Sequence, residues 1–372
     1  MNSKILSNAI EYSLSRVDEG LKTFKTTYPE PASVNGVYME CENVEWTNGF
    51  WTGMLWLAYE FTKDKKYLEC AFLQVDDFYN RIENKIAVEH HDMGFLYSLS
   101  CVAAYKLTEN EKAKNAAIMA AENLYGRFQE KGQFIQAWGE LGTKENYHLI
   151  IDCMMNVPLL FWASEVTEND KYQIVAKAHM DTTVKLVIRQ DFTTYHSYFF
   201  DVDTGKPLYG VTHQGYSDDS IWARGQAWGV YGLALAYGNT KNDEYMEKFL
   251  KVTDVFLDNL PKDNIPCWDL VFKDNKTLKD TSASAIVICG ILEMSRLCKL
   301  PDKYVNKAEE MMESLINNCL TTDIEHSNGI LKHGVYSIPH NSGIDECNIW
   351  GDYYFMEALM RMKNINWDSY WK

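Results

Sequence analysis

Two aspartates are the residues best placed in the sequence to carry acid–base chemistry. Asp152 lies in the apolar run Ile150-Ile-Asp-Cys-Met-Met155, where burial would oppose ionisation of its carboxyl and raise its pKa above the ordinary value of about 3.9. A general acid needs a carboxyl that keeps its proton near neutral pH. Asp92, in His90-His-Asp92, could raise that pKa further by like-charge repulsion. Both aspartates also stand where helices are expected to begin, so each could instead be an N-cap residue.

Three histidines, His91, His196 and His213, raise the question of a metal site. The spacing argues against one, because the side chains of neighbouring His90 and His91 diverge and the sequence contains no His-x-x-x-His pair. We predict no metal and assign these histidines to substrate hydrogen bonding or packing. The sequence also contains no Gly-x-Ser-x-Gly elbow, P-loop or dinucleotide fingerprint, so it lacks the commonest nucleophile and phosphate-binding motifs.

Arg224 lies between Trp222 and Trp228, in a stretch that is expected to be a buried helix. A buried arginine needs an anionic partner. That partner could be a protein carboxylate such as Asp218 or Asp219, or a carboxylate on the substrate.

Aromatic residues are numerous, with 16 Phe, 11 Trp and 23 Tyr. Their flat faces can stack on sugar rings, although aromatic residues also fill cores. Trp46, Trp138 and Trp228 are candidates for either role. Trp138 is the better candidate for a stacking platform, because its segment Gln133-Phe-Ile-Gln-Ala-Trp-Gly139 is predicted to be a loop. Carbohydrate is therefore the first substrate class that the composition suggests.

The charge balance excludes several partners. Of 372 residues, 36 are Lys or Arg and 52 are Asp or Glu, which gives a net charge of −16. Without a basic run, the chain is poorly suited to bind nucleic acid or an anionic membrane surface. With no signal-peptide pattern and no long apolar segment, we expect a cytoplasmic protein with a small-molecule substrate, and the oligomeric state stays open. The nine scattered cysteines form no Cys-x-x-Cys pair and favour reduced thiols.

The elements that would position these residues form a repeat. An apolar helix, a tight polar turn such as Glu165-Val-Thr-Glu-Asn-Asp-Lys-Tyr172 and a charged amphipathic helix recur five times. The apolar helices are predicted at about 48–62, 92–107, 149–166, 219–238 and 281–298, and the amphipathic ones at about 65–84, 109–129, 168–189, 242–260 and 301–320. Helices at 3–22 and 348–362 would complete a sixth pair. Twelve helices in six hairpins predict an all-α (α/α)6 toroid with an inner and an outer layer, built as one domain over residues 1–372.

The long connections all run from an outer helix to the next inner helix. They are predicted at 23–47, 84–91, 130–148, 190–218, 261–280 and 321–347, with a short strand at 195–200. Because the helices alternate in direction, these loops share one face of the toroid, which we call the long-loop face, and the inner helices begin there. Helix N-termini favour anions, and long ordered loops commonly carry function. The sequence therefore predicts the functional site on the long-loop face.

Five segments at the predicted inner-helix starts contain motifs that resemble those of a known protein family. They are Trp46-Thr-Asn-Gly-Phe-Trp-Thr-Gly53, His90-His-Asp-Met-Gly-Phe95, Ile151-Asp-Cys-Met-Met-Asn156, Gly215-Tyr-Ser-Asp-Asp-Ser-Ile-Trp-Ala-Arg-Gly-Gln-Ala-Trp-Gly229 and Asp345-Glu-Cys-Asn-Ile-Trp-Gly-Asp352. With them the chain resembles the unsaturated glucuronyl hydrolase family of glycoside hydrolases over nearly its whole length. The resemblance implies an (α/α)6 barrel that acts on the 4,5-unsaturated uronic acid at the non-reducing end of oligosaccharides left by polysaccharide lyases. No metal or organic cofactor is implied.

The resemblance also implies roles for individual residues. Asp92 and Asp152 match two essential aspartates, and Asp152 matches the general acid/base. The implied reaction is hydration of a vinyl ether rather than two-carboxylate glycoside cleavage. Asp152 would protonate C4, water would add at C5, and the resulting hemiketal would open and release the rest of the chain, while Asp92 would tune Asp152 and help to hold ring hydroxyls. The implied substrate-binding residues are Trp46, His91, Trp138, His196, His213, Gln214, Arg224 and Trp228. Among them, Arg224, together with the inner-helix dipoles, is the physical candidate for holding the substrate carboxylate.

The last long loop departs from some relatives. Those that prefer sulfated disaccharides carry a Ser-x-x-Ser-x-Lys pattern there. In this chain the loop reads Tyr336-Ser-Ile-Pro-His-Asn-Ser-Gly343, which keeps Ser337 but has His340 and Ser342 at the other two positions. We therefore expect a preference for unsulfated or lightly sulfated chondroitin or hyaluronan disaccharides.

Three other functions are compatible with these patterns. An unsaturated rhamnogalacturonyl hydrolase would share the toroid and the vinyl-ether chemistry but act on pectin fragments. A sugar 2-epimerase would need paired histidines as acid and base. A sugar-binding module would hold an anionic sugar without turning it over.

Overall fold

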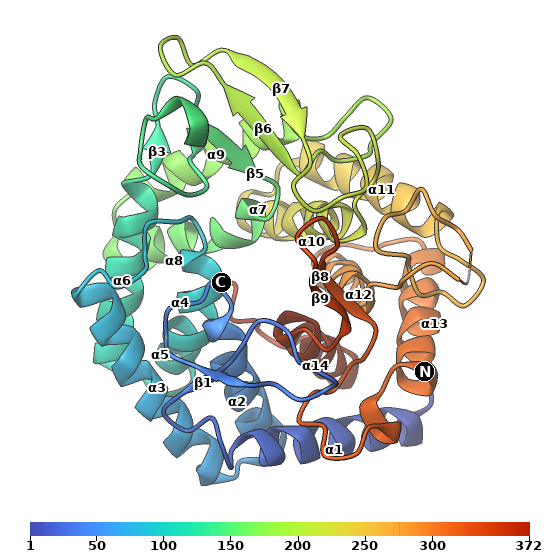
Figure 1. Cartoon of the computed structure of the whole chain (residues 1–372). Coiled ribbons are helices and arrows are strands. Elements are labelled where there is room, and N and C mark those ends of the chain that lie inside the picture. The colour runs from blue at the N-terminus through green and yellow to red at the C-terminus, as the bar shows by residue number, and fades with distance from the viewer. Residues whose placement is uncertain (275) are drawn as a thin grey trace.

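The structure is a computed structural model that describes residues 1–274 and 276–372. Its helices form an outer and an inner ring around a common axis (Figure 1). The outer ring consists of α1 (Ser3–Gly20), α3 (Lys65–Glu83), α6 (Glu111–Tyr125), α9 (Lys171–Leu186), α11 (Asp243–Asp258) and α13 (Asp302–Asn318).

Four positions of the inner ring are continuous helices and two are interrupted. The continuous helices are α2 (Asn48–Thr62), α10 (Ala223–Thr240), α12 (Thr281–Leu297) and α14 (Ile349–Lys363). One interrupted position comprises α4 (Met93–Tyr97), a π-helical turn (Ser98–Val102) and α5 (Ala103–Thr108), and the other comprises α7 (Cys153–Asn156) and α8 (Pro158–Thr167).

Contacts between neighbouring elements close the inner ring. Helix α2 packs against α4, α4 against α7, α7 against α10, α10 against α12, α12 against α14, and α14 against α2. Helix α1 packs against α14, so elements from both ends of the sequence share one hairpin. The predicted all-α toroid of six hairpins is confirmed.

Burial explains why the two rings differ in sequence. Helix α12 is buried continuously from Thr281 to Met294, because other elements surround it. Helix α13 buries one stripe of residues at helical spacing, namely Tyr304, Ala308, Met311, Met312 and Leu315.

The prediction of a helix from residue 149 is wrong, because this segment begins as a strand. Strand β5 (His148–Ile150) pairs antiparallel with β6 (Ser197–Phe200), which pairs with β7 (Pro207–Val211). The next helix, α7, starts only at Cys153, and α10 starts at Ala223 rather than near 219. The short apolar run 148–151 is equally compatible with a helix or a strand, and its pairing with a distant segment decides the outcome. The predicted strand at 195–200 is confirmed as β6.

Small sheets also fold the other long loops. Strands β1 (Tyr28–Pro29) and β2 (Glu40–Cys41) pair with each other, as do β3 (Phe128–Gln129) and β4 (Phe134–Ile135). Strands β8 (Gly334–Ser337) and β9 (Ser342–Glu346) form a hairpin that Figure 1 draws in red toward the centre of the ring. Two short 3-10 turns occur at Lys144–Asn146 and Thr321–Asp323.

Residues 364–372 close the end of the barrel opposite the long-loop face. Trp371 is buried and donates from Nε1 to Glu357 Oε2 at 2.9 Å. Lys106, near the end of α5, donates to the carbonyl of Ser369 at 2.7 Å. Among the described residues, no helix combines the length and apolar character needed to span a membrane.

Close contact between α4 and α7 depends on a glycine. A Cβ atom at Gly94 would lie 2.4 Å from the Cα of Asn156, far inside the normal contact distance. Asp92 and Asp152 stand directly before these two helices. The small residue therefore allows the two aspartate-bearing segments to approach each other.

We predict that Gly94→Ala destabilises the protein by about 1–3 kcal/mol, because two backbone segments would have to separate. The measurement is thermal or urea unfolding. Gly126→Ala is the matched control, since a Cβ there would meet its nearest atoms at 3.5 Å, an ordinary contact. Equal unfolding midpoints for the two variants would contradict this account.

Candidate active site

A cavity of about 210 Å³ opens at the long-loop face, among the starts of the inner helices. All the predicted site residues except His213 line it. The lining residues are Trp46, His91, Asp92, Trp138, Ile150, Asp152, His196, Gln214, Trp222, Arg224, Trp228 and Tyr336. The volume is below the roughly 300–1,000 Å³ of pockets that enclose drug-sized ligands, so the cavity has room for about one sugar ring.

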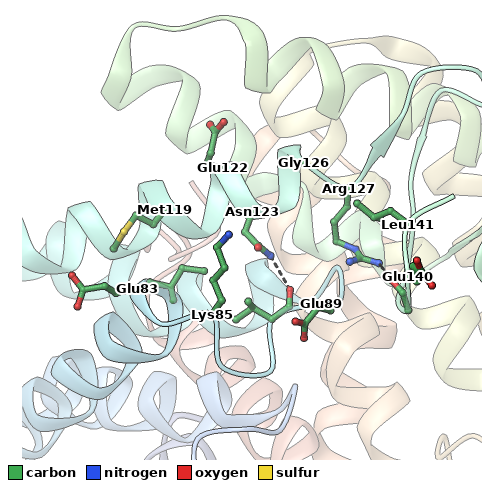
Figure 2. Close-up of a pocket in the computed structure, with 13 residues that line it drawn as sticks. Glu83, Lys85, Glu89, Met119, Glu122, Asn123, Gly126, Arg127, Glu140 and Leu141 are labelled. Carbon is green, nitrogen blue, oxygen red and sulfur yellow. Dashed lines mark hydrogen bonds between the residues drawn. The ribbon is translucent and has the colours of Figure 1, made fainter.

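A larger groove of about 650 Å³ lies on the outside of the barrel between α3 and α6 (Figure 2). Two of its polar groups are bound to the protein: Asn123 donates to the carbonyl of Val88 at 2.8 Å, and Arg127 donates to that of Gly139 at 3.2 Å. None of the predicted site residues lines this groove.

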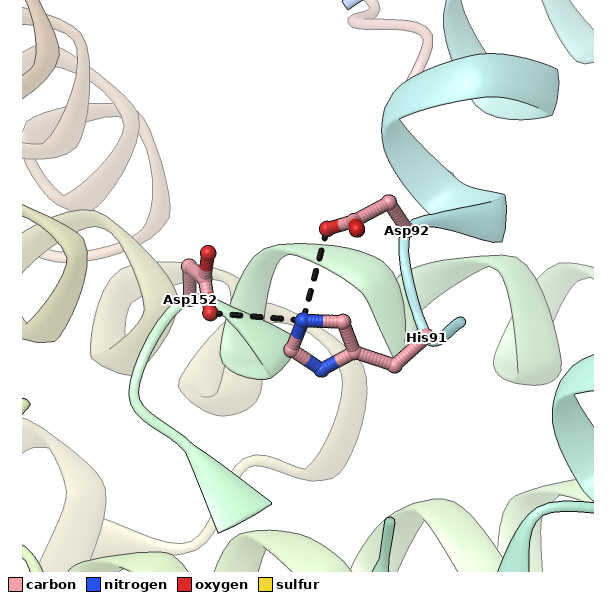
Figure 3. Close-up of side chains that lie close together, drawn as sticks. All are labelled: His91, Asp92 and Asp152. Carbon is pink, nitrogen blue, oxygen red and sulfur yellow. Dashed lines mark ion pairs between the residues drawn. The ribbon is translucent and has the colours of Figure 1, made fainter. Parts of the chain in front are cut away.

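The two aspartates meet at a single imidazole (Figure 3). His91 Nε2 lies 3.4 Å from Asp92 Oδ1 and 3.6 Å from Asp152 Oδ1. Burial lowers the pKa of His91 to about 4, so the ring is neutral near pH 7. The imidazole therefore connects the carboxyl groups without supplying a full positive charge.

The surroundings shift the pKa values of the two carboxyl groups in opposite directions. Burial, and next the charge of Asp92, raise the pKa of Asp152 well above its ordinary value. Burial alone would also raise the pKa of Asp92, but its contacts with His91, His90 and Asn156 outweigh burial and lower that pKa. Asp152 thus holds its proton to higher pH than Asp92 does, and two carboxyl groups of separated acidity are the arrangement that a general acid requires.

Backbone and side-chain contacts hold Asp92 in place. His90 Nδ1 lies 3.0 Å from Asp92 Oδ2, and Asn156 Nδ2 donates to Asp92 Oδ1 at 3.5 Å. Asn156 Oδ1 in turn accepts from the backbone N–H of Phe95 at 2.8 Å. Asn156 therefore links the start of α4 to the end of α7.

Neither aspartate acts as a side-chain N-cap. Asp92 and Asp152 precede α4 and α7, yet neither side chain accepts a capping hydrogen bond from its helix. Asp152 Oδ1 is buried and has no hydrogen-bond partner among the described residues. The capping alternative is therefore wrong for both side chains, and their catalytic role stays a prediction.

Arg224 has a different protein partner from those suggested by the sequence. Its Nη1 lies 3.0 Å from Asp280 Oδ2, so the partner is a protein carboxylate, one of the two alternatives, but neither of the suggested Asp218 and Asp219. Asp280 is also the N-cap of α12 and lies far from Arg224 in the sequence, which is why local inspection missed it. The remaining Nη hydrogens go to the carbonyls of Val335 and Tyr336 and to Gln214 Oε1.

These bonds define what Arg224 and Gln214 offer a ligand. All four Nη hydrogens of Arg224 are committed to protein acceptors. The bond from Arg224 fixes the side-chain oxygen of Gln214 and leaves its amide nitrogen free to donate. Arg224 therefore contributes to the cavity chiefly by holding Gln214 and the β8–β9 hairpin.

Two further histidines lie beside the cavity. The backbone N–H of His213 donates to His196 Nδ1 at 3.1 Å, so the neutral His196 ring carries its proton on Nε2. Burial is the main cause that lowers the pKa of His196 well below its usual value and also lowers that of His213. His213 stands behind the lining, with its ring centroid 5.4 Å from that of His196 and 5.6 Å from that of Trp138.

The tryptophans have unequal surroundings. Trp228 is buried against Phe95, with ring centroids 5.3 Å apart. Trp46 Nε1 donates to the hydroxyl of Tyr336 at 2.9 Å. Trp138 is 38% exposed at the rim, which agrees with the expectation that it is the better stacking platform.

Sequence inspection missed three lining residues, Ile150, Trp222 and Tyr336. Ile150 and Trp222 stand two residues before Asp152 and Arg224, so their position in the motifs was an available signal. Tyr336 has no such signal, because it reaches the cavity only through the folding of the β8–β9 hairpin.

The donor atoms of His91, Asp92 and Asp152 lie within 4.8 Å of one another, close enough to hold a metal ion. One imidazole and two carboxylates are also a common type of ligand set. The absence of a metal requirement therefore stays a prediction.

Comparison with known proteins places this site in a family. Residues 18–366 match the family described as Glycosyl Hydrolase Family 88. An unsaturated chondroitin disaccharide hydrolase of Streptococcus agalactiae serotype III is 47% identical, over 100% of this chain and 96% of the relative.

Solved structures agree with the family match. A crystal structure of unsaturated glucuronyl hydrolase from Streptococcus agalactiae has a TM-score of 0.97 at 46% identity and covers 100% of this chain and 94% of that one. A mutant of that enzyme complexed with dGlcA-GalNAc6S has a TM-score of 0.88 at 42% identity, with coverage of 98% and 93%. From its sequence match, its barrel and its paired carboxyl groups, the chain belongs to glycosyl hydrolase family 88.

Proposed function

We propose that this chain releases 4,5-unsaturated glucuronic acid from the non-reducing end of glycosaminoglycan disaccharides and oligosaccharides. The observation that carries the proposal is the pair of buried carboxyl groups beside His91, whose surroundings raise the pKa of Asp152 and lower that of Asp92. The names of the relatives support this substrate class over pectin fragments. In this proposal residues 1–372 act as one catalytic domain, since α1 and α14 complete the same ring.

Asp152 is the proposed acid. The substrate contains a C4=C5 bond conjugated to the ring oxygen and to the carboxylate, so a proton added at C4 leaves a cation at C5 that the ring oxygen stabilises. Asp152 has an unpartnered buried oxygen and a raised pKa. It can therefore deliver a proton in a site of about one sugar ring in volume.

Water completes the reaction at C5. Once Asp152 has given up its proton, its carboxylate can accept a proton from the attacking water, so the protein returns to its starting state. The product is a hemiketal, which opens by breaking the bond between C5 and the ring oxygen. The hemiacetal left at C1 then releases the neighbouring sugar.

Asp92 has two roles in this proposal. Its negative charge raises the pKa of Asp152 and so keeps the acid protonated. The same charge favours the cation that develops at C5, because opposite charges attract strongly in a site with little water. His91 spaces the two groups and orients Asp92.

The neutral donors of the cavity are suited to hydroxyl and carboxylate oxygens. Gln214 offers its amide nitrogen and His196 its Nε2, while Arg224 holds Gln214 in place. The start of α10 at Ala223 adds a favourable helix dipole for the substrate carboxylate. Trp46, Trp138 and Trp228 supply aromatic surface for the sugar, and His213 supports His196 and Trp138.

The hairpin over the cavity supports a preference for substrates without a sulfate. The hydroxyl of Ser337 is hydrogen-bonded to His340 Nδ1 at 2.7 Å, so a protein group already occupies one hydrogen-bonding position of this hydroxyl. A relative was crystallised with the ligand dGlcA-GalNAc6S, which makes the 6-sulfated disaccharide the natural comparison.

We predict that the protein consumes the unsaturated chondroitin disaccharide and that Asp152→Asn reduces kcat by at least about a hundredfold, because the general acid is lost. The measurement is the fall in near-ultraviolet absorbance as the conjugated double bond disappears. Asp203→Asn, at an exposed aspartate whose carboxylate is outside the cavity, is the control and keeps full activity. Turnover of a rhamnose-linked but not a hexosamine-linked disaccharide would contradict the proposal, and faster turnover of the 6-sulfated substrate would contradict the assigned preference.

The pH profile of the reaction should report Asp152. Asp152 works only when protonated, so kcat/KM is high below its raised pKa and falls as pH rises through that value. Replacing Asp92 by Asn removes the neighbouring negative charge, which lowers the pKa of Asp152 and moves the fall to lower pH. The check is the kcat/KM profile of Asp92→Asn, or carbon NMR of the Asp152 carboxyl if turnover is too slow. A fall at unchanged or higher pH would show that Asp92 does not set the acidity of Asp152.

We also predict that dialysis against EDTA leaves kcat/KM unchanged, because proton transfer from Asp152 needs no metal. The prediction could fail, because the donor atoms of His91, Asp92 and Asp152 lie close enough together to bind a metal ion. The assay is repeated after adding Zn²⁺, Mn²⁺ or Ca²⁺. Loss of activity on dialysis that one of these ions restores would show that the three residues bind a metal.

A further inference from the structure

Tyr216 is an aromatic residue whose side chain is largely exposed and lies outside the hydrophobic core. Its side chain is 64% exposed. Its ring packs edge-on against Phe272, with centroids 5.1 Å apart, and near Trp268, with centroids 6.4 Å apart. Trp268 and Phe272 also pack against each other. Together the three residues form an aromatic cluster of which Tyr216 is the outer member.

The backbone that carries Tyr216 is held firmly. The buried carboxylate of Asp269 accepts from the N–H of Tyr216 at 2.9 Å, from the hydroxyl of Ser220 at 2.6 Å and from the N–H of Ile221 at 3.1 Å. Arg189 adds bonds to the carbonyls of residues 218–220. A loop this constrained presents its exposed aromatic side chain at a fixed position, which is a property of binding loops.

The aromatic cluster lies on segments that are adjacent in sequence to residues of the cavity lining. Gln214, two residues before Tyr216, lines the cavity, and so does Trp222 on the same loop. Trp222 forms an antiparallel bridge with Asp269, the residue next to Trp268. The loop thus runs from the cavity lining to the exposed ring of Tyr216 within a few residues.

The size of the cavity places the rest of a substrate outside it. A volume of about 210 Å³ takes one ring, so the sugars after the unsaturated residue must lie along the rim. Trp138 and Tyr216 are both exposed aromatic residues in loops that line the cavity. Sugar rings stack on such faces through their C–H groups.

We propose that Tyr216, supported by Phe272 and Trp268, is a stacking site for a pyranose ring beyond the disaccharide, so that it binds substrates of three or more sugars. This inference rests on the proposed function, because the ring it binds belongs to the same oligosaccharide. In this proposal the effect depends on chain length, because only a substrate of three or more sugars would extend to Tyr216.

The test compares an unsaturated chondroitin disaccharide with the corresponding tetrasaccharide. In Tyr216→Ala we expect KM for the tetrasaccharide to rise about 3- to 10-fold, the loss typical of one aromatic contact, with kcat and all disaccharide constants unchanged. Tyr216→Phe keeps the ring and should restore tetrasaccharide KM. Tyr209→Ala is the matched control, since Tyr209 is 55% exposed on β7, and it should change neither substrate.

The other possible results distinguish failure of the stacking site from failure of the proposed function. If the unaltered protein consumes both substrates and Tyr216→Ala changes neither, or changes both equally, the stacking site is wrong while the proposed function stands. Turnover of the disaccharide but not of the tetrasaccharide also overturns the stacking site alone. If neither substrate is consumed, the proposed function fails and the stacking site fails with it. A change of sedimentation coefficient in Tyr216→Ala would assign the residue to contacts between protein molecules instead.

Discussion

Burial of two carboxyl groups beside one neutral imidazole is the constraint on which the rest of the site depends. Two negative charges in such a place would repel each other strongly, so one carboxyl keeps its proton. The surroundings decide which one: Asp92 contacts His90 and Asn156 as well as His91, whereas Asp152 Oδ1 has His91 at 3.6 Å and no hydrogen-bond partner among the described residues. The two pKa values thus diverge because contacts with neighbouring side chains outweigh burial at Asp92, whereas burial and the charge of Asp92 dominate at Asp152.

The barrel supplies the close approach that this constraint needs. Helices α4 and α7 meet at Gly94 and Asn156, where a side chain on the glycine would collide with backbone. Both belong to interrupted inner-ring positions, and α8 starts with Pro158 at a position where a missing N–H costs nothing. The continuous inner helices form the frame, and the interrupted ones place the aspartates at its mouth.

A second buried charge organises the other side of the cavity. Arg224 and Asp280 neutralise each other between α10 and α12, and the remaining donors of Arg224 hold Gln214 and the β8–β9 hairpin. The ion pair therefore connects the rigid barrel to a loop-borne donor and to Tyr336. In the proposed function, recognition of the substrate relies largely on the neutral donors Gln214 and His196, which need no counter-charge in the cavity.

The sequence by itself determined the six helical hairpins, because burial leaves a local record in the spacing of apolar residues. It also determined most of the cavity lining, since motifs around Asp92, Asp152 and Arg224 stand where inner helices begin. Only the tertiary structure decided that His148–Ile150 is a strand, that Asp280 is the partner of Arg224, and that Tyr336 reaches Trp46. Each of these depends on a contact between segments far apart in the chain, and such contacts leave no trace in local composition or periodicity.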